Sequence, residues 1–189
     1  PAAETARSRG RATSGAALLL TGLLLGTSAQ AELPVPCAGG SCGGGIPDFV
    51  TAGQANYHVH DHQAIVNQVG DKAILNWESF NVSPAHSVQF QQVDSLTAQN
   101  LVQGANFTTL NRVWDNDPSV IAGILTQAAG QKANIILVNT TGIAFLASSQ
   151  ANPTSFTAGS LALHDRFIRN PFLTPQQTSP HYAGYGWCH

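Results

Sequence analysis

Two stretches decide the fold class of this chain: Asp71-Lys-Ala-Ile-Leu-Asn-Trp-Glu-Ser-Phe-Asn-Val82, and Ile135-Ile-Leu-Val-Asn-Thr-Thr-Gly-Ile143. Each is a short apolar burst interrupted by Asn, Gly or Ser, and neither is long enough for a convincing amphipathic helix. Similar bursts recur along most of the chain. The pattern predicts an all-β chain of short strands, which we expect at 73–77, 87–91, 110–113, 120–125, 135–138, 143–146 and 156–163.

The composition excludes one class of partner. Charged residues make up only 10% of the chain, which contains 12 Asn and 14 Gln, so its polar needs are met mainly by neutral amides that can stack in ladders. The net charge of -2 provides no basic field for a phosphate backbone, and we therefore expect no nucleic-acid partner.

The strand pattern alone leaves two architectures open. A parallel β-helix and a β-sandwich both accommodate about seven short strands. In a β-helix, inward side chains from successive coils form one continuous apolar column. The residues expected in that column are Ile74, Leu75, Trp77, Phe80, Val88, Phe90, Val113, Ile121, Leu125, Ile136, Val138, Ile143 and Phe145.

In their order and spacing, the blocks from about Phe49 to about Arg169 resemble the secretion domain at the N-terminus of filamentous haemagglutinins and related two-partner-secretion exoproteins. The resemblance implies a right-handed parallel β-helix (solenoid) and no catalysis. It implies a dedicated outer-membrane transporter, whose periplasmic POTRA domains could pair with strand edges of the unfolded chain. It also implies secretion via the periplasm, an extracellular or cell-surface location, and adhesion to host or bacterial surfaces by the full-length exoprotein.

The turn motif of this chain, Asn139-Thr140-Thr141-Gly142-Ile143, carries part of the resemblance. Asn at the first position and Gly at the fourth favour a type I turn, which we expect to join two paired strands at 135–138 and 143–146. The family usually has Asn-Pro-Asn-Gly here, so Asn139, Gly142 and Ile143 match the pattern, whereas Thr140 and Thr141 depart from it. The resemblance implies that this motif belongs to the region that the transporter recognises.

The N-terminal residues 1–31 are typical of a secretory signal peptide. Three arginines precede an apolar core at 16–25, and Ala29-Gln-Ala31 has the small-x-small form that signal peptidase accepts. The apolar core is too short for a membrane span, which needs ~20 residues. We therefore expect export by the general secretory machinery and a mature chain that begins at Glu32.

The rest of the chain divides into three zones. Residues 32–48 form a Gly/Pro-rich lead-in, 49–169 the two-partner-secretion β-helix, and 170–189 an irregular tail. Because the solenoid pattern stops near Arg169, the chain is expected to be a truncated member of the family. In the lead-in, Cys37 and Cys42 flank Ala-Gly-Gly-Ser, a segment flexible enough to bring them together, and we predict a disulfide between them.

An alternative function rests on His58, His60 and His62. Alternate residues of a strand point to one face, so the three imidazoles could bind zinc or copper, with Glu78 as a further ligand. The chain would then be a secreted metal-dependent enzyme or metal-binding protein. The simpler interpretation is a solvated strand face, and we predict no cofactor and no enzymatic activity.

Overall fold

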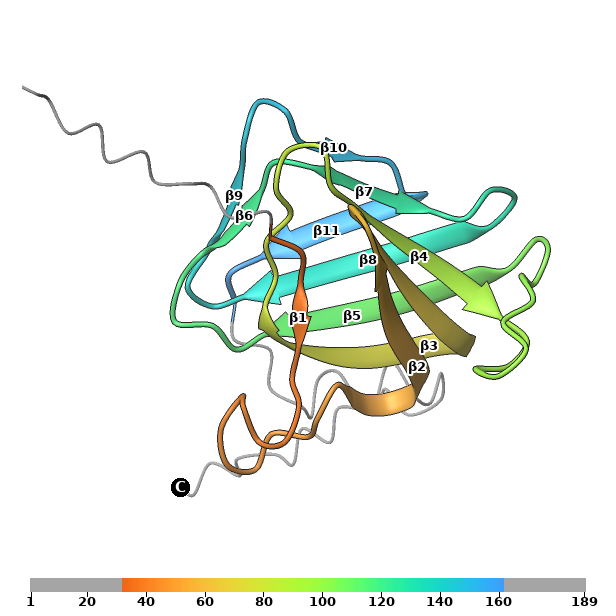
Figure 1. Cartoon of the computed structure of the whole chain (residues 1–189), viewed down its shortest axis with the longest axis horizontal. Coiled ribbons are helices and arrows are strands. Elements are labelled where there is room, and N and C mark those ends of the chain that lie inside the picture. The colour runs from red at the N-terminus through yellow and green to blue at the C-terminus, as the bar shows by residue number, and fades with distance from the viewer. Residues whose placement is uncertain (1–31, 162–189) are drawn as a thin grey trace, which may run out of the picture.

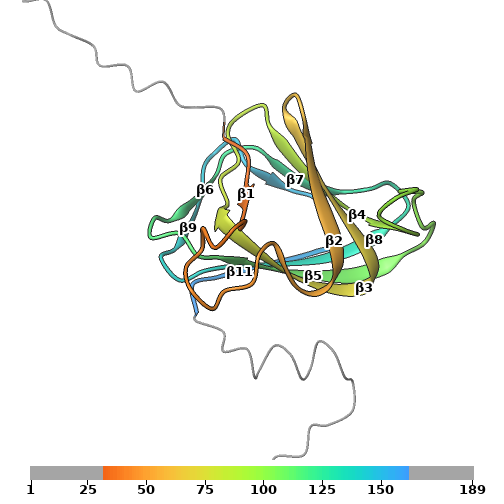
Figure 2. The ribbon, with the colours of Figure 1, turned by 60° about the horizontal axis from the view of Figure 1, so that its bottom comes forward.

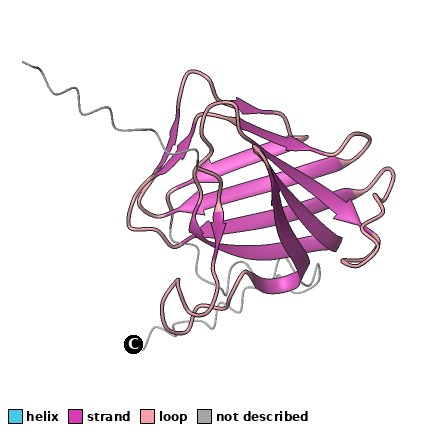
Figure 3. Ribbon diagram, in the orientation of Figure 1, coloured by secondary structure: helices cyan, strands magenta, loops and turns pink. Residues whose placement is uncertain are grey.

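The computed structural model describes residues 32–161, and within this range the chain consists of strands and loops without a helix (Figures 1 and 3). Among these residues there is accordingly no helix that could cross a membrane. The expected signal peptide and tail lie outside the described residues. The strands are β1 Val35–Pro36, β2 Val50–His60, β3 Gln63–Ser79, β4 Ser87–Val93, β5 Asn106–Val113, β6 Ser119–Ile121, β7 Ile124–Gln127, β8 Lys132–Asn139, β9 Ile143–Phe145, β10 Gln150–Ala151 and β11 Ser155–Gly159.

The parallel strands form three faces, which the chain visits in the same order in each coil. The first half of β3 forms the first face with β4, β7 and β10, and the second half of β3 forms the second face with β5, β8 and β11. The third face contains β6 and β9, with a bridge from Val82 to Ile121. Figure 2 shows the three faces enclosing the core. Because strands of successive coils pair in parallel, the expected parallel β-helix is confirmed, and a β-sandwich is excluded since its sheets are antiparallel.

The strands expected from the sequence all overlap observed strands, with two differences. The segment 120–125 is divided between β6 and β7 by a corner at Ala122 and Gly123. The expected pairing of 135–138 with 143–146 is wrong: β8 pairs with β5 and β11, while β9 pairs with β6. The chain changes direction at each corner, so consecutive strands belong to different faces.

The core of the β-helix is centred on Trp77, which is fully buried. Its ring packs edge-on against Phe49, Tyr57 and Phe80, at centroid distances of 5.0, 5.2 and 5.2 Å. The indole N–H donates to the Oδ1 of buried Asn111, 3.0 Å away, so the polar atom of this large side chain is satisfied inside the core. Of the expected column, Leu75, Trp77, Phe80, Val88, Phe90, Val113, Ile121 and Leu125 are buried in this cluster, with Ile143 packed against it.

Four residues of the expected column lie elsewhere. Ile74, Ile136 and Val138 belong to a second cluster on the outer side of the second face, together with Leu110 and, from β2, Ala52. In β8, Ile135 and Leu137 point inward instead. Side chains alternate along a strand, so an uninterrupted apolar run does not reveal which half faces the core. Phe145 remains 46% exposed.

The N-terminal edge of the β-helix is covered by antiparallel strands. β2 pairs with β3 from Val50 to His60, and β1 pairs with the end of β3. Tyr57 ties these elements together because its hydroxyl donates to Pro34 O at 2.6 Å. Burial raises the pKa of Tyr57 to about 12, so the phenol stays protonated and remains a donor at neutral pH.

Alkaline pH is expected to remove the contribution of Tyr57. Between pH 10 and about 12 the unfolded phenol ionises before the folded one, so the unfolding free energy falls as the pH rises through this range. Tyr57→Phe should lose about 1 kcal/mol at neutral pH, and this difference from wild type should shrink above pH ~10. Urea unfolding of both proteins across this range measures the difference. A difference that stays constant would contradict this role.

Gly123 forms the corner between the third and first faces, where successive coils approach closely. A Cβ at this position would collide with His86 O, lie 2.5 Å from Ser83 O and lie 2.7 Å from a methyl group of Val82. The backbone N–H groups of Ala122 and Gly123 both donate to Val82 O, so the corner cannot move away without losing hydrogen bonds.

Gly123→Ala should therefore lower the unfolding free energy by about 1–3 kcal/mol, the usual cost of overpacking. Gly159→Ala is the matched control, because a Cβ there meets no atom within 4 Å. Urea denaturation of both variants is the measurement. Equal stabilities of the two variants would show that the corner accommodates a side chain.

Candidate functional site

The turn motif adopts the expected turn. Gly142 N donates to Asn139 O at 3.0 Å, which closes the turn from its first to its fourth residue. The Asn139 side chain is fully buried and uses both ends of its amide. Its Nδ2 donates to Asp117 O and to Ser119 Oγ, and its Oδ1 accepts a hydrogen bond from Thr141 N at 2.9 Å. Asn139 therefore fixes the turn and attaches it to the preceding coil.

The turn motif is stacked on the loop of residues 114–118, which occupies the same corner one coil earlier. Thr141 Oγ1 donates to Asp115 O at 3.0 Å, and Ser119 N donates to Gly142 O at 3.0 Å. Gly142 has a φ of +126°, a conformation that residues with a side chain rarely adopt. Thr140 and Thr141, where the sequence departs from the family pattern, are the exposed residues of the turn.

A pocket of about 300 Å³ lies between the turn and this loop. Its lining combines the exposed threonines with an arginine, an aromatic ring and an acidic side chain: Arg112, Val113, Trp114, Asp115, Asn116, Val138, Thr140 and Thr141. On the other side of the loop, a second hollow of about 350 Å³ reaches the lead-in. Trp114, Asp115 and Asn116 line both, so this loop separates the two hollows.

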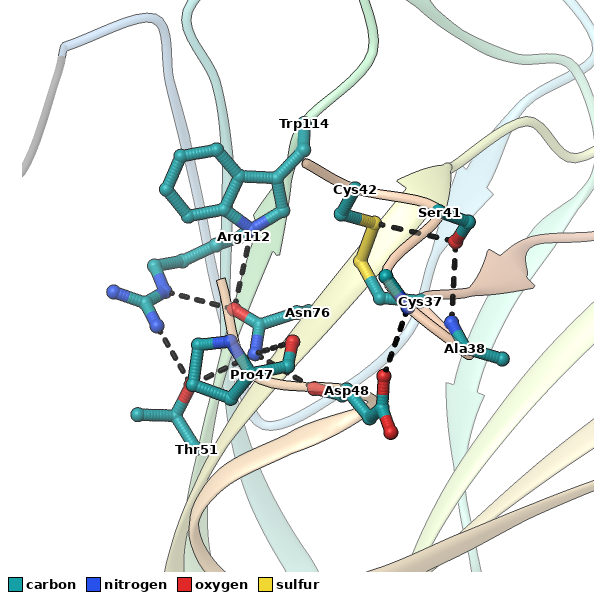
Figure 4. The surroundings of a disulfide bond; sticks show 11 residues. Cys37, Ala38, Ser41, Cys42, Pro47, Asp48, Thr51, Asn76, Arg112 and Trp114 are labelled. Atoms are coloured by element: carbon teal, nitrogen blue, oxygen red, sulfur yellow. Dashed lines mark hydrogen bonds between the residues drawn. A yellow bond between two sulfur atoms is a disulfide. The ribbon is translucent and has the colours of Figure 1, made fainter. Parts of the chain in front are cut away.

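Trp114 and Arg112 are held by Asn76 on the outer side of the second face (Figure 4). The Oδ1 of Asn76 accepts from Arg112 Nε and from Trp114 Nε1, each at 3.2 Å. The Arg112 guanidinium also donates to Thr51 Oγ1 at 2.8 Å and lies 5.5 Å from the Trp114 ring centre. The sequence interpretation missed this group, because its members are far apart in the chain.

Cys37 and Cys42 are joined by a disulfide in the lead-in, with their Cα atoms 5.6 Å apart (Figure 4). Cys37 is buried, and its backbone N–H donates to Asn76 O at 3.1 Å. Asn76 Nδ2 in turn donates to Asp48 O at 2.9 Å and to Pro47 O at 3.3 Å. Asn76 thus connects the lead-in, the Arg112–Trp114 pair and β3.

The candidate metal ligands do not converge. His58 and His60 lie in β2, but Asp61, with a φ of +51°, and His62 form the turn into β3, so the three residues do not share one strand face. His58 contacts Gln99, His60 contacts Asp61, and His62 contacts His86. Glu78 lines the hollow beside Cys42 instead. Among residues 32–161, no group of three or more His, Cys, Asp or Glu side chains could hold a metal ion.

The family model of the TPS secretion domain matches residues 47–182. The chain belongs to this family of two-partner-secretion domains. A solved structure, the HMW1 secretion domain from Haemophilus influenzae, superposes on this TPS domain with a TM-score of 0.53 and 29% sequence identity. The match covers 64% of this chain and 28% of that one, so the chain spans less than a third of the length of the protein it resembles. A comparison with curated protein sequences gives no match.

Membership establishes the function of the domain. A TPS domain is a secretion-targeting domain, found at the N-terminus of an exoprotein that leaves the cell via the periplasm and a partner outer-membrane transporter. The family is defined by secretion rather than by catalysis. The domain boundaries expected at residues 49 and 169 remain predictions.

Asn139→Ala should destabilise the TPS domain by about 1–3 kcal/mol, because it leaves the buried Ser119 Oγ, and also Asp117 O and Thr141 N, without their partner. Thr140→Ala is the matched control at a neighbouring exposed position and should change the unfolding free energy by less than about 0.5 kcal/mol. Thermal and urea denaturation measure both. A stable Asn139→Ala protein would show that the turn does not depend on this side chain.

Proposed function

We propose that this TPS domain is the N-terminal, secretion-targeting part of a filamentous haemagglutinin-like adhesin. One observation supports its place at the start of a fibre: β1 and β2 cap one end of the β-helix, whereas within the described residues β10 and β11 each pair with a single strand. Coils can therefore be added in one direction only. Adhesion to host or bacterial surfaces would belong to the full-length exoprotein, and the domain would act outside the cell or at its surface.

We place the processing site after Ala31, so that general secretion and signal peptidase deliver a chain beginning at Glu32. Glu32 already takes part in the fold: its N donates to Ser83 Oγ at 2.9 Å, and its O accepts from Ser83 N at 3.1 Å. A free N-terminal ammonium at this position would keep the donor that the first bond needs. The lead-in with its disulfide would then close the N-terminal end of the domain.

For the transporter, we propose recognition through its periplasmic POTRA domains of the region that contains Asn139, Thr140, Thr141, Gly142 and Ile143. Thr140 and Thr141 are exposed beside the 300 Å³ pocket, so they can contact a partner without disturbing the core. Before folding, the same segments can offer strand edges for pairing. The alternative of a metal-dependent enzyme with His58, His60 and His62 has no support from the geometry, since these side chains have separate partners.

Gly142→Val tests this assignment. Valine would be strained at the φ of +126°, at a cost of about 1–3 kcal/mol, and secretion into the medium should fall several-fold. Thr140→Pro should leave secretion equal or better, because Pro presets the backbone at the second turn position. The measurement is the amount of protein in the medium of cells that co-express the partner transporter.

Ala144→Val is the control for Gly142→Val, because it introduces the same side chain two residues away at an exposed strand position. It should secrete like wild type. Secretion that does not respond to Gly142→Val, or that falls equally with Ala144→Val, would remove the turn motif from the recognition region while leaving the fold unaffected.

A further inference from the structure

His62 and His86 form a close pair at the capped end of the β-helix. His62 lies in the turn between β2 and β3, and His86 lies in the loop that leads into β4. The Nδ1 atom of His62 is 3.0 Å from the Nε2 atom of His86, and the two rings are nearly perpendicular, at 84°. His86 is only 6% exposed, whereas His62 is exposed. The pair thus has one buried and one accessible imidazole.

The nitrogen atoms are spaced as two ligands of one metal ion would be. Imidazole nitrogens bind such ions at ~2.0–2.1 Å, so two nitrogens 3.0 Å apart subtend about 90–97° at a shared ion. This angle suits neighbouring positions of a tetragonal or octahedral site.

The ring positions agree with this spacing. If both rings point at one ion ~2.0–2.1 Å away, their centres lie about 4.6–4.7 Å apart, whereas a straight N–H···N bond would separate them by about 5.3 Å. The observed separation is 4.6 Å. The N···N contact is therefore bent, as a shared ion would require.

His86 also has the support that a metal-binding histidine normally has. Its Nδ1 is 3.0 Å from Pro84 O, and because a carbonyl oxygen can only accept, Nδ1 of His86 carries the hydrogen. The Nε2 of the neutral ring then accepts the hydrogen bond from His62 Nδ1, and a metal ion would take the place of that proton. The backbone is fixed on both sides: His86 N donates to Ser83 O, Ile124 N donates to His86 O, and Ser87 N donates to His62 O. The pair is held in place before any ligand binds.

We propose that His62 and His86 form a binding site for a first-row divalent transition metal ion, with Cu²⁺ bound more tightly than Ni²⁺ or Zn²⁺. His86 contributes Nε2. His62 contributes Nδ1 after its proton moves to Nε2 on the exposed side of the ring, so both imidazoles remain neutral. Water fills the other coordination positions. Asp61, the neighbouring carboxylate in the turn, contacts His60 and is not part of the site.

Binding would connect two separate parts of the first coil. His62 belongs to the capping hairpin and His86 to the corner before the second coil, and they are 24 residues apart in sequence. The unfolded chain does not hold the two rings together, so the ion should bind the native state preferentially and stabilise it. The site would therefore act on the folded domain after export.

The test is Cu²⁺ titration of the protein purified from the medium, treated first with a chelator and followed by calorimetry and electron paramagnetic resonance. We expect one site with two nitrogen ligands and a thermal midpoint that rises with Cu²⁺. His62→Ala should weaken binding at least ~10-fold and abolish the rise in the midpoint. His62→Ala is the decisive variant because His62 is exposed, so its loss should not prevent folding. His86→Ala, at a buried position, is a second test if that protein folds.

His60→Ala is the matched control, two residues away in the same hairpin, and it should bind Cu²⁺ within about twofold of wild type. His58→Ala serves the same purpose further along β2. Binding that survives His62→Ala, or that is lost equally in His60→Ala, would overturn the proposal and show that Cu²⁺ binds exposed histidines without a defined site.

Discussion

The pairing of β3 with strands on both of its edges is the constraint on which the domain depends. Its first half pairs with β4 and its second half with β5, so one strand starts two faces. Gly70, with a φ of +81°, stands between the two halves. The buried side chain of Gln68 fixes this corner. Its Nε2 donates to Gly70 O, and its Oε1 accepts a hydrogen bond from Thr109 Oγ1 of the next coil at 2.7 Å. Antiparallel β2 covers the remaining edge.

Most of the polar side-chain contacts between strands and coils are hydrogen bonds of neutral Asn and Gln amides rather than ion pairs. On the outside of the first face, side-chain hydrogen bonds link Gln63, Gln89, Gln91, Asn67 and Asn56 across neighbouring strands. Inside, Gln131 joins coils through Gln92 and Val102. A buried amide with all its partners is less costly than a buried charge, and it needs no counter-ion. The low charge content noted in the sequence follows from this mode of stacking.

The sequence predicted the strands and the turn motif because both depend on local chemistry. Asn139 and Gly142 satisfy a turn within four residues, and apolar bursts identify strands regardless of their partners. The sequence could not decide which side of β8 faces the core, because the run 135–138 is apolar throughout. The outer cluster that Ile136 and Val138 join is formed with residues of strands distant in the chain. β2 was not among the expected strands, since Gly, Gln, Asn and His alternate irregularly with its apolar residues and its pairing with β3 supplies the order. The contacts of Asn76 with Arg112, and of His62 with His86, join positions far apart in the chain, for which no local signal exists.

The central claim is that this β-helix is a secretion-targeting domain that requires a partner transporter. The most direct measurement is the amount of the chain in the culture medium of otherwise identical cells with and without that transporter, with an unrelated secreted protein as an internal standard. The account predicts export into the medium only when the transporter is present, with the standard unchanged. Equal amounts of the chain in both media would contradict it.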